Sequence, residues 1–104
     1  MPEHLQIAQV KLVTIVAAFQ LANRIGTDLR ALGVSGYTKT KVDGWGTHGT
    51  REAGIIDGAN VRFDTLVPAE LARALLELVD TQFKNRGVIA FAVDADAVPK
   101  SHFA

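Results

Sequence analysis

The segment VRFDTLVP, residues 61–68, predicts a strand that runs directly into a helix. Its side chains fall into two alternating sets, and a period of two is the pattern of a strand with two different faces. Proline is favoured at the first position of a helix, because the N–H that it lacks would have no partner there. The apolar face of the helix that follows consists of Leu71, Leu75, Leu78 and Phe83.

The first half of the chain shows a similar order of elements. Val10–Ala17 is nearly continuous in apolar, mostly β-branched residues, which predicts a strand that is covered on both faces or lies in the middle of a sheet. Apolar residues then recur at helical spacing over Phe19–Leu32, and Gly36–Val42 alternates like a strand. After the second helix, Val88–Val93 predicts a last strand, followed by a short C-terminal tail at about residues 97–104.

This order, strand-helix-strand in each half, predicts a single α+β domain over residues 1–104. It is the order of the ferredoxin-like βαββαβ arrangement, in which a four-stranded antiparallel sheet carries two helices on one face. The first and third strands have apolar side chains on both faces. We therefore expect another subunit to cover the face of the sheet that has no helices.

Composition excludes several classes of protein. The 104 residues contain no cysteine, which excludes disulfides, thiolate metal sites and cysteine nucleophiles and favours a reducing cytosol. Basic and acidic residues balance to a net charge of zero without a basic cluster, which argues against a nucleic-acid partner. The apolar run Leu12–Phe19 is too short to span a membrane. We expect a cytoplasmic protein that binds no nucleic acid.

A glycine-rich loop at about residues 43–58 separates the two halves. It is far longer than a hairpin needs, and long loops between strands often bind ligands. In GWGTHG, residues 44–49, backbone N–H groups could converge on an anion, with Thr47 and His48 as further donors and Arg51 as a cation. A simple hairpin would also explain the glycines, and Trp45 fits either an apolar anchor or a wall of a ligand cleft.

The sequence predicts neither catalytic nor metal-binding residues. Ser35 and Ser101 have no visible base partner, so nucleophilic catalysis has no support. The three histidines do not have the spacing of metal ligands. They are His4, His48 and His102.

Two alternative functions remain open. An acylphosphatase-like hydrolase would need a cationic phosphate cradle between the first strand and the first helix, where residues 17–20 read AAFQ and have no cation. A trimeric ferredoxin-like protein that binds divalent metal would use histidine or carboxylate ligands, for which Asp94 and Asp96 are candidates at the end of the last strand.

Three motifs in order resemble the PII family of signalling proteins: LGVSGYT at residues 32–38, DGWG at 43–46 and VRFDTLVP at 61–68. The resemblance extends over about residues 9–98. It implies a homotrimer of ferredoxin-like subunits with adenine-nucleotide sites in the clefts between them. It also implies that residues 43–58 form the T-loop, which changes shape on ligand binding and docks a target, commonly a membrane transporter.

The resemblance also assigns ligand contacts by position. Gly36 and Thr38 would line the adenine pocket, and Asp64 and Leu66 would face the adenosine from the third strand. Trp45 would then be a wall of the cleft. The residues that approach the phosphates would be Gly44, Gly46, Thr47, His48 and Gly87.

Departures from the family pattern predict which nucleotide binds. Val88 stands where the family has a phosphate-binding lysine, and residues 99–101 stand where it has arginines that hold the terminal phosphate. Arg86 and Lys100 would replace these cations in part, so we expect AMP, ADP or cyclic AMP rather than ATP. These losses resemble the branch of the family that is linked to inorganic carbon. That branch implies bicarbonate as a second ligand, with Arg51 as a contact to phosphate or bicarbonate. It also implies that the protein partner is a bicarbonate transporter or a carboxysome component.

Overall fold

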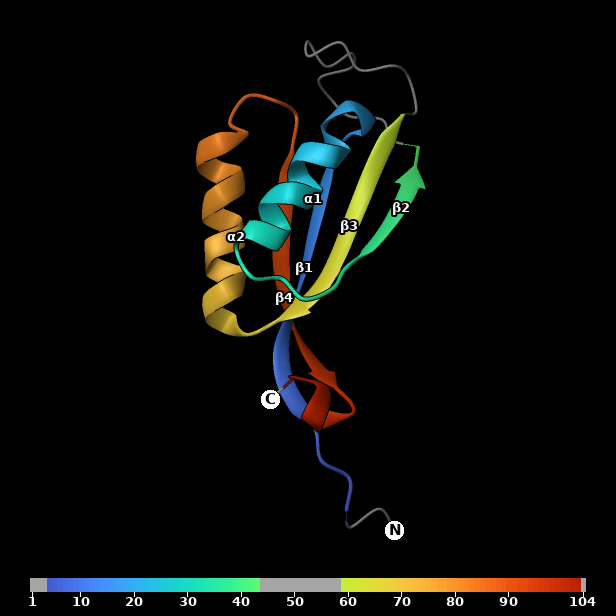
Figure 1. The fold of residues 1–104 in the computed structure, drawn as a ribbon, viewed down its shortest axis with the longest axis vertical. Helices are drawn as coiled ribbons and strands as arrows, with labels where there is room; N and C mark the ends of the chain where they lie inside the picture. The colour runs from blue at the N-terminus through green and yellow to red at the C-terminus, as the bar shows by residue number, and fades with distance from the viewer. Residues whose placement is uncertain (1–3, 44–58, 104) are drawn as a thin grey trace.

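The structure is a computed structural model that describes residues 4–43 and 59–103 (Figure 1). In chain order its elements are β1 (Ala8–Ala18), the 3-10 helix η1 (Phe19–Leu21), α1 (Ala22–Ala31), β2 (Thr38–Val42), β3 (Asn60–Val67), α2 (Ala69–Gln82), β4 (Ile89–Ala97) and the 3-10 helix η2 (Lys100–Phe103). The strands form one antiparallel sheet in the order β2-β3-β1-β4. Both α-helices cover the same face of this sheet (Figure 1). The predicted ferredoxin-like α+β fold is confirmed.

The core lies between the sheet and the two α-helices. Alternate residues of β1 and β3 point into it, among them Ile15 and Phe63, which are each 1% exposed. Ile25 and Leu29 of α1 and Leu75 of α2 close it from the other side. Burial of these apolar faces is the main stabilisation of such a layer. No helix in the described part of the chain has the length and apolar character needed to cross a membrane.

The opposite face of the sheet is not covered by α1 or α2 (Figure 1). Ala90 and Ala92 of β4 pack against the core, so the alternate residues of this strand face away from the helices. These are Ile89, Phe91 and Val93, with exposed fractions of 60%, 47% and 47%. A row of large exposed apolar side chains is typical of a surface that binds another protein.

Several element ends differ from the sequence prediction, two of them by three residues or more. Apolar spacing predicts that the first helix begins at Phe19, but residues 19–21 form the 3-10 turn η1 and α1 begins at Ala22. The last strand continues to Ala97, beyond the predicted end at Val93. The reason is that β1 begins at Ala8, so every residue of β4 from Ile89 to Ala97 has a partner in β1. Half of the predicted tail then folds as η2.

The two ends of the sheet carry different connections (Figure 1). The end of β2, the start of β3 and the α2–β4 connection lie at one end. At the other end β1 and β4 extend beyond the helices as a two-stranded ribbon, against which η2 packs. The end of the sheet at which a predicted ligand-binding residue lies determines which other such residues it can meet within one subunit.

Candidate functional site

A pocket of 610 Å³ lies between β3, the α1–β2 connection and η2. Four of the predicted ligand-binding residues line it: Gly36, Thr38, Asp64 and Leu66. The sheet register explains why they meet. Thr38 of β2 pairs directly with Asp64 of β3, and Leu66 lies two residues further along the same face.

Gly36 leaves open space at the edge of this pocket. A Cβ atom added there would meet no atom within 4 Å. The carbonyl oxygen of Gly36 accepts a hydrogen bond of 2.6 Å from the Thr65 hydroxyl, which fixes the backbone of the α1–β2 connection against β3. The arrangement lets a ligand approach the backbone closely at a position that is hydrogen-bonded to β3.

Asp64 is held by two neighbours on the face away from the helices. The hydroxyl of Thr14, which is buried, donates to its carboxylate at 2.8 Å. The Nε of Arg62 donates to the same carboxylate at 2.9 Å. The carboxylate is thereby fixed in orientation and paired with a cation, so it offers the pocket an acceptor in a defined position.

His102 and Phe103 of η2 also line this pocket. The sequence pattern predicts no ligand contact for either residue. They lie in the C-terminal tail, where the sequence has no period of a strand or a helix, and their approach to the pocket depends on the turn that follows Pro99. Only the folded chain brings them to β3.

Arg86 and Gly87 lie away from this pocket, in the α2–β4 connection. Gly87 has a φ of 74° and Asn85 a φ of 63°, so the chain turns through two left-handed residues before β4. β4 then separates Arg86 from Lys100, and its nine residues place its ends about 26 Å apart at about 3.3 Å per residue. Within one subunit these two cations cannot hold the same phosphate group.

The other predicted contacts lie outside the described residues. They are Gly44, Trp45, Gly46, Thr47, His48 and Arg51.

The chain on either side of that segment forms a second pocket, of 320 Å³. It is lined by Lys41 and Asp43, next to the end of β2, and by Phe19 of η1. The Lys41 ammonium lies 4.9 Å from the centre of the Phe19 ring, an attractive cation–π contact. Since Ile89 pairs with Val16 near the same end of β1, this pocket and the α2–β4 connection share one end of the sheet.

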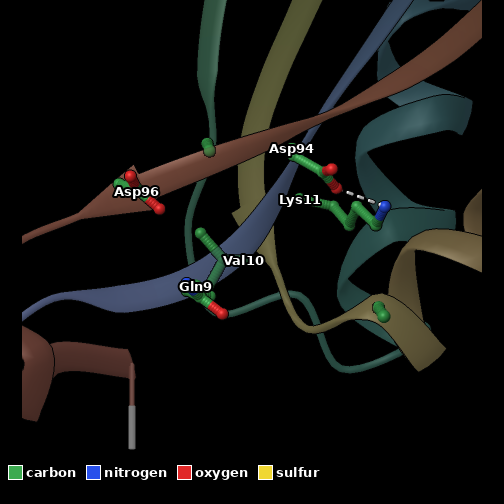
Figure 2. Close-up of a pocket in the computed structure, with 7 residues that line it drawn as sticks. Gln9, Val10, Lys11, Asp94 and Asp96 are labelled. Atoms are coloured by element: carbon green, nitrogen blue, oxygen red, sulfur yellow. Dashed lines mark hydrogen bonds and ion pairs between the residues drawn. The ribbon is translucent and has the colours of Figure 1, made fainter.

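A third pocket, of 380 Å³, lies where β1 and β4 pass the start of α2 (Figure 2). Lys11 of β1 and Asp94 of β4 are paired in register and joined by an ion pair, while Asp96 lies further along β4, away from Lys11. The described residues contain no group of three histidine, cysteine, aspartate or glutamate side chains that could hold a metal ion. The Lys11 ammonium lowers the pKa of Asp94, first through its hydrogen bond and second through its charge.

Replacing Asp94 with asparagine is expected to cause a small loss of stability at neutral pH, because the pair is largely exposed. A lowered pKa in the folded state stabilises the protein above the ordinary carboxylate pKa of about 4, and this contribution is lost as the pH falls through the folded value. Melting temperatures of both proteins between pH 7 and about pH 2 should therefore converge at the acid end. A difference that persists unchanged in acid would contradict the charge-based origin.

The chain matches the family model for the nitrogen regulatory protein P-II over residues 10–100. Among solved structures it is similar to a PII-like signalling protein from Thermus thermophilus, with 30% identity, coverage of 95% of this chain and 99% of the other, and a TM-score of 0.78. CPII, a PII-like protein from Thiomonas intermedia, was solved with ADP and bicarbonate and is 26% identical over 96% and 99% of the two chains, with a TM-score of 0.80.

A second structure of CPII contains ADP, AMP and bicarbonate. It is also 26% identical, over 88% of this chain and 98% of CPII, with a TM-score of 0.75. No curated protein matches the chain by sequence.

Proposed function

Since this chain belongs to the nitrogen regulatory protein P-II family, we propose that it is a signalling protein that binds an adenine nucleotide between the subunits of a homotrimer. In this proposal residues 1–104 act as one PII-like domain. The observation that carries it concerns the predicted ligand contacts among the described residues: four of them line the 610 Å³ pocket, whereas Arg86 and Gly87 lie in the α2–β4 connection, away from it.

Each group is half of a nucleotide site. The pocket at Gly36, Thr38, Asp64 and Leu66 offers walls for a nucleoside but has no lysine or arginine among its lining residues. Arg86 lies at the other end of β4 and offers a cation. A cleft between two copies would bring the pocket of one subunit beside the α2–β4 connection of its neighbour, and would supply both a base pocket and a partner for phosphate.

The helix-free face of the sheet supports self-association. Its exposed row on β4 is joined by Leu66 of β3, which is 37% exposed. Covering these apolar side chains with a second copy would remove them from water, and a chain of 104 residues gains most from such help because its own core is small. A closed ring of three copies would cover every such face.

We propose ADP or AMP as the nucleotide, with cyclic AMP as a further candidate, and bicarbonate as a second ligand. The CPII structures hold ADP, AMP and bicarbonate. The missing family cations at Val88 and at residues 99–101 support a nucleotide with fewer phosphates than ATP, because each absent cation removes a charge-assisted hydrogen bond.

Ligand binding would select one state of the loop at residues 43–58 and so control docking to a partner. A ligand shifts such an equilibrium only by the difference in its affinity for the two states. The partner would be a bicarbonate transporter or a carboxysome component, so that the protein regulates inorganic-carbon uptake or carboxysome function. It would act in the cytoplasm and reach a membrane only through this partner.

The proposed role is sensing without catalysis. The acylphosphatase-like alternative lacks support because residues 17–20 contain no cation. The divalent-metal alternative lacks support in the described part of the chain, where no cluster of three ligands occurs. A short acyl-phosphate assay and a calorimetric titration with copper and zinc would detect either activity directly.

Calorimetric titration of the purified protein tests the main proposal. ADP and AMP are expected to bind more tightly than ATP, and bicarbonate is expected to tighten nucleotide binding when added first. GDP is the control for base selectivity, and light scattering reports whether the protein is trimeric. If no adenine nucleotide binds at millimolar concentration, or if the protein is a monomer under these conditions, the proposal is wrong.

A further inference from the structure

The C-terminal turn η2 is anchored to the ribbon formed by β1 and β4. The backbone N–H of His102 donates to the Pro99 carbonyl oxygen at 3.1 Å, which closes the turn. The Phe103 ring packs on a small apolar cluster at the paired ends of the two strands. That cluster consists of Ala8, Val10 and Ala97. The turn is therefore tied to the sheet through an apolar contact.

The two aromatic rings of η2 have a fixed relation to each other. Their centres lie 4.9 Å apart and their planes meet at 83°, which is the favourable edge-to-face geometry. Phe103 is half-buried and His102 is exposed. Phe103 thus anchors the pair, and the imidazole remains free to meet a ligand on the solvent side.

The pocket that these rings line has the character of a site for a planar base. Leu12 and Leu66 contribute apolar surface to it, and Thr38 and Asp64 contribute polar groups. A flat heterocycle is bound well by aromatic and aliphatic walls with a few polar atoms that fix its edge. Aromatic side chains stack on any nucleobase, because every base has a π face.

We propose that His102 and Phe103 form an aromatic wall for the base of the bound nucleotide, with Phe103 as the anchor and His102 as the stacking surface. This inference rests on the proposed function, and it assigns a role to the C-terminal turn in place of the phosphate-binding arginines that the chain lacks. Because stacking involves the base and not the phosphates, its loss should weaken AMP and ADP by the same factor.

Three single variants test the wall by calorimetry with AMP and ADP. His102→Ala is expected to weaken both nucleotides equally, by roughly 10-fold. His102→Phe keeps a ring at the same position and should retain most of the affinity. Ser101→Ala is the matched control, since Ser101 belongs to the same turn but does not line the pocket. Melting curves of all four proteins check that the fold is kept.

The outcomes separate this inference from the proposed function. Wild-type affinity in His102→Ala, with normal binding by the parent protein, would overturn the aromatic wall and leave the proposed function intact. A loss for ADP that is clearly larger than the loss for AMP would show a phosphate contact and would also overturn it. If the parent protein binds no adenine nucleotide, both are wrong.

Discussion

Replacing Phe63 with alanine is expected to lower the free energy of unfolding by about 3–5 kcal/mol. The ring is 1% exposed and lies on β3 beneath the helices, with its centre 5.2 Å from that of Tyr37 in an edge-on contact. Alanine would leave a cavity between the sheet and the helices, which cannot all move to fill it. Since proteins of this size are stable by only about 5–15 kcal/mol, such a loss would bring the fold close to unfolding.

Guanidinium denaturation at one fixed protein concentration measures this loss, because self-association makes stability depend on concentration. Phe19→Ala is the matched control. It removes the same ring from a site that is 43% exposed, where the ring contacts the Lys41 ammonium. We expect a loss of less than about 1 kcal/mol there. A loss at Phe63 no larger than that at Phe19 would contradict the assigned core.

The same substitution should also affect the ligand pocket. Phe63 precedes Asp64, which lines the pocket from the other face of β3. Tyr37, whose ring rests against Phe63, lines the pocket as well and receives a hydrogen bond of 2.9 Å from Arg30. Phe63 thus positions two residues that line the pocket, Tyr37 and Asp64. A core that repacks around alanine would change the shape of the pocket, although Phe63 itself does not line it.

β3 shows how much of the fold could be predicted from sequence. Its alternation places Phe63 and Thr65 toward the helices and Asp64 and Leu66 toward the opposite face. A slip of one residue would exchange the two sets, so the pattern fixes both the strand and its orientation. The helices follow from apolar spacing in the same way. Local patterns were sufficient because each of these elements has one buried face.

The parts that were not predicted depend on contacts between distant segments. The length of β4 is set by its pairing with β1, and its last residues, 94–97, alternate only between aspartate and alanine, which are both depleted in strands. The approach of His102 to the pocket depends on the packing of Phe103 against that same pairing. Likewise, the sequence assigns Arg86 and Lys100 to one nucleotide, but only the fold shows that they flank β4 from opposite ends. Such relations follow from topology and register.

Two variants that each bind ADP weakly are expected to regain tight ADP binding when their subunits are mixed in one trimer. Gly36→Val would fill the open space beside the pocket, and it should fold normally because Gly36 has neither a left-handed φ nor an atom within 4 Å of its added Cβ. Arg86→Ala would remove the cation at the other end of β4. Loss of a charge-assisted hydrogen bond costs about 1.5–3 kcal/mol, so we expect Arg86→Ala to bind ADP at least about 10-fold more weakly. We expect Gly36→Val to weaken ADP binding as well, because its side chain would occupy space beside the pocket that the ligand needs.

Mixed trimers of these variants would contain one cleft of wild-type composition. That cleft would pair the intact pocket of an Arg86→Ala subunit with the intact α2–β4 connection of a Gly36→Val subunit. Unfolding the two proteins together and refolding them would produce such trimers, and calorimetry would report the regained high-affinity sites as a fraction of the subunits present. The gain arises only if each site is shared between two subunits, because mixing cannot repair a site that lies within one chain.

Refolding each variant alone by the same procedure is the control, and it should leave ADP binding weak. A refolded wild-type sample sets the value for complete recovery. If the mixture binds no more ADP than the two pure variants, the pocket at Gly36 and the cation at Arg86 do not belong to one shared cleft. That result would contradict the assignment of these two groups to one site between subunits. The proposed trimer and the proposed nucleotide would stand if the wild-type protein still binds ADP tightly.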